Sequence, residues 1–202
     1  MKKLIIYLIL VVFVAIIAAF YLQGRLAPVT DKFVESKAKF IANEIINNTI
    51  IEALTTMGEE EFFVLGKNNE GRIISSTTNT VAMNLFKSRL HNQLNERFGK
   101  IEDSNFGVPI LNIIGMDWMS GWGAKIPVRL LYNGSILADF ENEFISAGIN
   151  QTKHVIYIKT NADVWAIISG RQILCQVENR IPVAEVVVMG DVPNLWLNGL
   201  GR

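Results

Sequence analysis

The chain begins with an apolar run and then changes to patterns in which apolar and polar positions recur with a period. From Leu4 to Leu22 there is no charged residue. At a rise of about 1.5 Å per residue, a helix over this run extends about 28 Å, close to the hydrocarbon thickness of a bilayer. The apolar stretch of a signal peptide is usually shorter, about 7 to 15 residues, and ends at small residues. The pattern therefore predicts an uncleaved signal anchor, with a short leader and one transmembrane helix in residues 1–25.

The charges that flank this run do not by themselves decide which end is cytoplasmic. Lys2 and Lys3 precede it, whereas Arg25 and Lys32 follow it. Because long domains cross a membrane largely regardless of their charge, and the leader is very short, we expect the N-terminus in the cytoplasm. Residues 26–202 are then expected to form one extracytoplasmic α+β domain of a single-pass membrane protein.

Behind the predicted anchor, apolar residues spaced by three and four positions predict two helices on either side of a hairpin. Thr30 is a plausible N-cap for the first helix, which ends near Gly58. Residues 62–65 and 72–76 are predicted to pair as two strands. The apolar residues of the first helix are Val34, Ala38, Ile41, Ile45, Ala53 and Leu54, and the second helix, over Thr80–Phe98, has a stripe of Met83, Phe86, Leu90, Leu94 and Phe98.

In the second half of the chain the period changes to two, with β-branched runs separated by turn residues. Asn133–Gly134 and Ser169–Gly170 are typical of tight hairpin turns, and strands joined in this way are antiparallel. The fold class expected is α+β, in which an N-terminal transmembrane helix is followed by a helix-hairpin-helix unit and an antiparallel β-sheet meander. The predicted strands are 126–132, 135–144, 153–159, 164–169, 172–178 and 183–189.

Composition narrows the range of functions without selecting one. Half of the 202 residues are apolar and the formal net charge is zero, so a folded core is expected. A nucleic-acid-binding surface as the main function is disfavoured, because such proteins concentrate Lys and Arg on one face. Cys175 is the one cysteine of the chain, which excludes an intramolecular disulfide and cysteine-rich metal modules. We expect no cofactor.

Asp139, Glu141 and Glu143 are the residues most suggestive of chemistry. They alternate along one predicted strand, which places three carboxylates on one face, where they could attract a cation or act as an acid and base pair. A solvated strand face is the favoured interpretation. His154 is expected to be partly buried and hydrogen-bonded, with a catalytic or pH-sensing role as the alternative. His91 is expected on the polar side of its helix, and no zinc-ligand spacing, serine nucleophile motif or phosphate loop is present.

Exposed aromatic residues are a second kind of candidate. Trp118, Met119 and Trp122 lie among glycines, and Trp196 lies in the C-terminal tail. Such side chains can anchor at a membrane interface, stack on a glycan or enter a partner protein, although covering the core is the favoured reading. With His154 they make up the residues that the sequence offers for an interaction.

Three stretches resemble a known family: 125–128, with the letters KIPV; 146–154, with SAGINQTKH; and 181–193, with IPVAEVVVMGDVP. With the N-terminal apolar run they are similar, in order, to the sporulation protein YunB family of endospore-forming bacteria. The resemblance implies a membrane-bound protein that is made in the mother cell and needed for efficient spore formation. It implies no reaction and no catalytic residue.

Our first hypothesis is a non-enzymatic, membrane-anchored protein with a structural or interaction role in the mother-cell or outer forespore membrane. Its expected partners are the membrane, other sporulation membrane proteins or a second copy of itself, and not nucleic acid. The alternatives are an envelope-acting hydrolase that uses Asp139, Glu141, Glu143 and His154, and a sensor domain for a small ligand.

Overall fold

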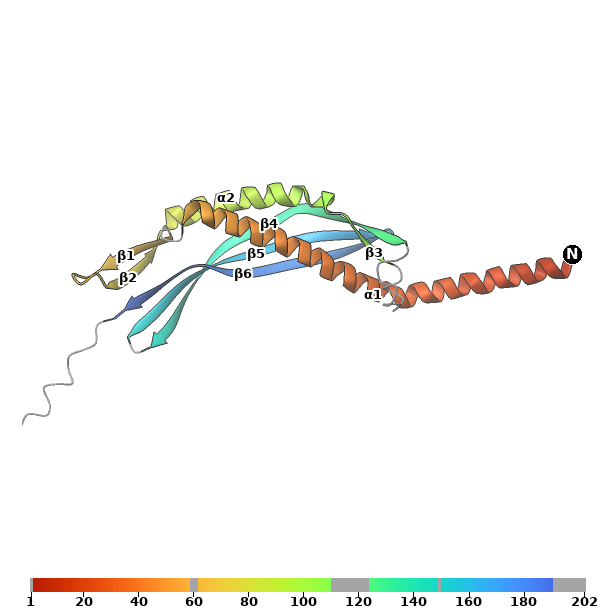
Figure 1. Ribbon diagram of the computed structural model, residues 1–202, viewed down its shortest axis with the longest axis horizontal. Coiled ribbons are helices and arrows are strands. Elements are labelled where there is room, and N and C mark those ends of the chain that lie inside the picture. The colour runs from red at the N-terminus through yellow and green to blue at the C-terminus, as the bar shows by residue number, and fades with distance from the viewer. Residues whose placement is uncertain (1, 59–61, 110–123, 149, 191–202) are drawn as a thin grey trace, which may run out of the picture. The chain divides into compact units, whose positions relative to one another are not determined.

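The computed structural model describes residues 2–58, 62–109, 124–148 and 150–190 (Figure 1). Along the chain it has a long helix, a two-stranded sheet, a second helix, a short 3₁₀ helix and a four-stranded sheet. The α+β class and the antiparallel sheets are therefore confirmed. Trp118, Met119, Trp122 and Trp196 lie outside the described residues.

The first helix, α1, extends from Lys2 to Met57 without a break. The predicted start at Thr30 is wrong, because the Thr30 hydroxyl donates a hydrogen bond to the Leu26 carbonyl 2.8 Å away, one turn back in the same helix. Pro28 lies inside the helix. Proline removes one backbone donor, and here the helix continues past it in both directions.

The transmembrane helix expected at Leu4–Leu22 is a prediction that the structure corrects. Among the residues described, none of the helices combines the length and the apolar character that crossing a bilayer requires. Leu4–Leu22 is not a separate apolar element but the first part of α1, which continues through Arg25, Asp31 and Lys32. Several large apolar side chains in this part are more than half exposed, among them Ile6, Leu10, Phe13 and Ile17.

The buried stripe of α1 follows a spacing close to four. Val34, Ala38 and Ala53 are fully buried, as the apolar pattern predicts, but Ala42 and Ile46 take the positions expected for Ile41 and Ile45. Small alanine side chains leave little distance between the helix and the residues that cover it. The stripe consists of Thr30, Val34, Ala38, Ala42, Ile46, Thr49, Ile50 and Ala53.

The hairpin and the second helix are where the sequence predicts them. Strands β1 (Phe63–Lys67) and β2 (Ile73–Thr78) pair antiparallel, with Phe63 opposite Thr78. Helix α2 covers Thr80–Gly99, and the Asn79 side chain accepts a hydrogen bond from the Ala82 N–H at 3.2 Å, as an N-cap does. All five residues of the predicted stripe are buried: Met83, Phe86, Leu90, Leu94 and Phe98.

The larger sheet has the strand order β3-β4-β5-β6. After the 3₁₀ helix Ile101–Asp103, strand β3 (Phe106–Pro109) pairs antiparallel with residues 125–128 of β4. The six strands predicted beyond residue 125 form three long ones instead. These are β4 (Lys125–Gly148), β5 (Gln151–Ile168) and β6 (Arg171–Met189).

Two glycine turns predicted from sequence have different outcomes. Ser169 and Gly170 both have positive φ, 48° and 77°, and join β5 to β6 as a tight turn. Gly134 also has positive φ, 73°, but β4 continues through it, so the hairpin predicted at Asn133–Gly134 is wrong. A single left-handed glycine is compatible with an irregularity in a continuous strand as well as with a turn.

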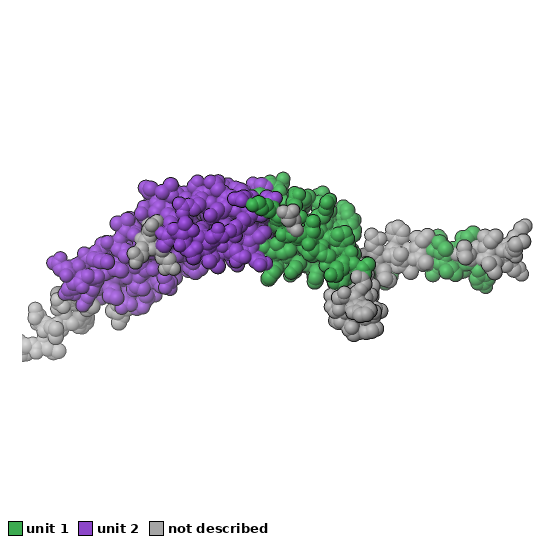
Figure 2. All heavy atoms as spheres, turned by 45° about the horizontal axis from the view of Figure 1, so that its top comes forward, with its two compact units in different colours: residues 1–41, 100–133, 164–175 green, residues 42–99, 134–163, 176–202 purple. Residues whose placement is uncertain are grey.

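The chain separates into two compact units (Figure 2). The first comprises residues 1–41, 100–133 and 164–175, and within it Arg171 of β6 pairs with Asp31 of α1 at 2.8 Å. The second comprises residues 42–99, 134–163 and 176–202, and its core includes Phe62, Phe86 and Ile156. A single domain over 26–202 stays a prediction.

Candidate interaction site

The three carboxylates of β4 lie on one face of the strand, as period two requires. In this part of β4, Ile136 and Ala138 are buried, whereas Leu137 and Asp139 are exposed. Glu141 and Glu143 continue the outward-facing series. Each of the three carboxylates has a cationic partner, contributed by a segment distant in sequence.

Arg180 of β6 holds two of the carboxylates. Its Nε lies 3.2 Å from Glu141 Oε2, and its Nη2 lies 2.6 Å from Glu143 Oε2. The guanidinium also lies over the Tyr157 ring of the intervening strand β5, 3.5 Å from the ring centre. Hydrogen bonds to Glu143 and Glu141 raise the pKa of Arg180 above its ordinary value. The result is a charged cluster across three strands on the outer face of the sheet.

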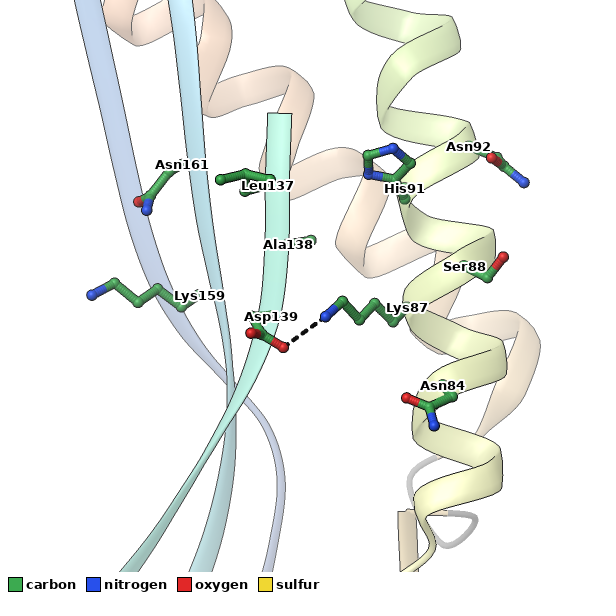
Figure 3. Close-up of a pocket in the computed structure, with 10 residues that line it drawn as sticks. All are labelled: Asn84, Lys87, Ser88, His91, Asn92, Leu137, Ala138, Asp139, Lys159 and Asn161. Carbon is green, nitrogen blue, oxygen red and sulfur yellow. Dashed lines mark hydrogen bonds and ion pairs between the residues drawn. The ribbon is translucent and has the colours of Figure 1, made fainter. Parts of the chain in front are cut away.

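Asp139 has a different partner, Lys87 of α2, whose Nζ lies 2.8 Å from Asp139 Oδ1 (Figure 3). The same carboxylate oxygen accepts a hydrogen bond from the Phe140 N–H at 2.9 Å. Both donors lower the pKa of Asp139, the Lys87 bond contributing most. The Asp139 side chain is nevertheless 76% exposed, so water competes strongly with Lys87 for this carboxylate.

His154 is buried on the opposite face of the sheet from these carboxylates. Asn142 Oδ1 lies 3.1 Å from its Nε2 and Ser76 Oγ lies 3.3 Å from its Nδ1. An amide oxygen can only accept, so this placement of Asn142 fits a proton on Nε2. In the neutral imidazole with that tautomer, Nδ1 can accept from the serine hydroxyl. The rings of Phe63 and Phe144 contact the imidazole, with centres 5.0 and 4.2 Å away.

This histidine therefore connects the β1–β2 hairpin to β4. Asn142 and Phe144 alternate with Glu141 and Glu143, so the side chains that reach His154 point away from the carboxylate face. The acid and base set of the hydrolase alternative is not assembled by this arrangement. Among the described residues there is also no group of three His, Cys, Asp or Glu side chains placed to hold a metal ion.

Because His154 is buried, we expect the stability of the folded chain to depend on pH. Burial lowers the pKa of His154 from its ordinary value of 6.5. The unfolded chain therefore takes up a proton as pH falls through about 6.5 while the folded chain does not, so stability decreases below that pH and levels off below the folded pKa. Urea unfolding between pH 7.5 and 5 should show this decrease. The variant His154→Gln should lose less stability over this pH range than the unchanged protein. His91→Gln, changed on the exposed side of α2, should lose as much as the unchanged protein. An equal loss in the unchanged protein and both variants would show that His154 is not the cause.

A groove of about 660 Å³ lies between α2 and the strands β4 and β5 (Figure 3). The helix contributes polar side chains from one face, and the strands contribute the exposed side chain of Leu137, the Lys87–Asp139 pair and residues of β5. Apart from Leu137 and Ala138 the lining is polar or charged: Asn84, Lys87, Ser88, His91, Asn92, Asp139, Lys159 and Asn161. The groove belongs entirely to the second unit.

Residues 105–195 match the family model described as Sporulation protein YunB. A relative named Sporulation protein YunB, from Bacillus subtilis (strain 168), is 25% identical over 196 residues, which is 92% of this chain and 77% of the relative. The resemblance to the YunB family is confirmed. No solved structure matches the chain.

The part that matches the YunB model contains β3 to β6, and thus the strand walls of the groove and the charged cluster. Helix α2, which contributes the other wall, lies outside residues 105–195 but within the span of the alignment to the Bacillus subtilis relative, which covers nearly the whole chain. The YunB-like stretch at 146–154 spans the link from β4 to β5 and ends at His154.

Sequence reasoning found the carboxylates and His154 but missed their partners. Lys87, Arg180 and Ser76 are 52, 37 and 78 residues from Asp139, Glu143 and His154, respectively. No motif spans such separations. The one available signal is the position of Lys87 and His91 on the polar side of α2, where both indeed line the groove.

Proposed function

We propose that this chain contributes to endospore formation as a non-enzymatic, protein-binding component. The family resemblance indicates the role in endospore formation. The observation that supports a binding role is the pairing of the carboxylates, since Glu141 and Glu143 share the guanidinium of Arg180 while Asp139 pairs with Lys87. Carboxylates paired in this way form a charged surface, and the only buried histidine of the described residues, His154, lies on the opposite face of the sheet.

The partner in this proposal is a protein, either another component of spore assembly or a second copy of the chain. The α2–β4 groove is the surface we assign to it, because it combines hydrogen-bonding side chains with the exposed Leu137, 66% exposed. A mixture of polar groups and a solvent-exposed apolar side chain is typical of the interfaces of non-obligate complexes. The hydrolase alternative lacks such support, because His154 and the carboxylates face opposite sides of the sheet.

The proposal is tested by removing the two carboxylates that lie outside the groove. In the organism that makes this chain, a variant carrying Glu141→Gln and Glu143→Gln should restore heat-resistant spores to a deletion strain as fully as the unchanged gene does. The amides keep the shapes of the side chains and can still accept hydrogen bonds. Spore counts as low as those of the deletion strain, from a variant whose circular dichroism shows a folded protein, would favour the enzyme.

A further inference from the structure

Among the described strands, none pairs with one edge of β4 over the length that borders the groove. Strand β3 pairs with β4 only from Lys125 to Val128, and beyond Val128 no described strand lies on that side of β4. An unpaired strand edge presents N–H and C=O groups that can pair with another chain. In this part of β4, the described residues beside that edge include those that line the groove.

The direction of the free backbone groups follows from one hydrogen bond. The Phe140 N–H is bonded to the side chain of its neighbour Asp139, so it does not point to β5. In an antiparallel strand, the N–H and C=O of one residue point to the same side, and successive residues alternate. Ala138 therefore directs its backbone groups to the open edge as well, and Ala138 is one of the residues that line the groove.

The charges beside this edge favour one kind of strand. Lys87 and Lys159 line the groove with a single carboxylate, that of Asp139. Lys159 has its own partner, Glu178 of β6, at 2.9 Å, but both side chains remain well exposed, as do those of Lys87 and Asp139. A carboxylate carried by a ligand can thus reach either lysine at little cost, because exposed ion pairs contribute little to stability.

We infer that the groove between α2 and β4 binds an extended, acidic peptide segment of a partner protein, which adds as a strand to the open edge of β4. The segment pairs with the backbone of Ala138 and places a carboxylate on Lys87, in exchange for Asp139. The polar face of α2, with Asn84 and Ser88, contacts its side chains. Strand addition gives affinity through main-chain hydrogen bonds, and the neighbouring side chains give specificity. This inference rests on the proposed function and names the chemistry of the partner.

Binding is tested with the full chain and three labelled ten-residue probes. The first alternates valine and glutamate, the second alternates valine and lysine, and the third is the acidic probe with every second backbone nitrogen methylated. Fluorescence anisotropy should show binding of the acidic probe and at least about tenfold weaker binding of the other two, because each loses a set of charge pairs or main-chain hydrogen bonds. Hydrogen exchange should show that the acidic probe protects the Ala138 N–H.

Variants distinguish binding in the groove from a general attraction between the acidic probe and positive charges on the protein. Lys87→Glu should weaken binding of the acidic probe at least about tenfold, whereas Arg89→Glu, the same reversal of charge at an exposed position of α2 outside the groove, should have little effect. Asp139→Asn should tighten binding, since it releases Lys87. Ala138→Pro should abolish binding, because proline has no N–H to donate at the edge.

The inference is overturned if the acidic and basic probes bind alike, if the acidic probe leaves the Ala138 N–H unprotected, or if Lys87→Glu and Arg89→Glu weaken binding equally. The hydrogen-exchange result uses the unchanged protein, so it decides even where Ala138→Pro disturbs folding. Failure of this inference leaves the non-enzymatic role intact, because that role is decided by the spore counts of the Glu141→Gln, Glu143→Gln variant, whose two positions lie outside the groove.

Discussion

Phe86→Ala should lower the free energy of unfolding by about 3–5 kcal/mol, the usual cost of emptying a buried phenylalanine site. Phe86 is fully buried on α2. Its ring centre lies 5.3 Å from that of Phe62 and 6.0 Å from that of Phe140, so it joins the segment before β1 and the middle of β4 to the helix. Truncation removes both aromatic contacts and leaves a cavity that the surrounding rings cannot fill.

Urea unfolding followed by circular dichroism measures this loss. Leu85→Ala is the matched control, because Leu85 is the adjacent residue of the same helix and is 61% exposed. Its effect should stay within about 0.5 kcal/mol, as for most surface substitutions. Similar losses for the two variants would mean that α2 does not pack through the stripe that contains Phe86.

Cys175→Asp should be the second severe substitution, with a loss of about 3–5 kcal/mol at pH 7, the cost typical of an uncompensated buried charge. Cys175 is fully buried in β6, and burial, with a smaller effect of Glu35, raises the pKa of its thiol to about 11. The same surroundings that disfavour a thiolate disfavour a carboxylate. Cys175→Ala introduces no charge and should cost much less.

The pH dependence of this variant identifies the cause. A buried carboxylate has a raised pKa in the folded chain, so lowering the pH protonates it there first and should restore part of the lost stability relative to Cys175→Ala. The difference between the two variants should therefore shrink between pH 7 and pH 5. A difference that stays constant over this range would show that steric misfit, and not the charge, destabilises the Asp variant.

The elements best predicted from the sequence are those that local patterns specify. The stripe of α2 from Met83 to Phe98 is predicted residue by residue, because one face of a helix repeats at three and four positions. The β1–β2 hairpin and the Ser169–Gly170 turn are likewise local features. The alternation of side chains along a strand also predicts that Asp139, Glu141 and Glu143 share one face, whatever the arrangement of the sheet.

The errors occurred where one local signal permits two structures. Gly134 and its positive φ fit a turn and also a continuous strand, and the pairing of β4 with its neighbour decides between them. Thr30 has the chemistry of an N-cap, but inside α1 its hydroxyl bonds to Leu26 instead. The apolar run at Leu4–Leu22 continues into the same helix through charged residues, so its end could not be located from apolar character alone.

By itself, the sequence determined the α+β class, the buried face of α2, the common face of the carboxylates and the resemblance to the YunB family. Only the tertiary structure decided the partners of Asp139 and His154, the separation of these two residues onto opposite faces of the sheet, and the groove beside the open edge of β4. The physical reason is range. A periodic pattern reports on residues that are close together along the chain. An ion pair such as Lys87–Asp139 instead depends on how a helix and a strand pack together, with the two residues 52 positions apart in the sequence.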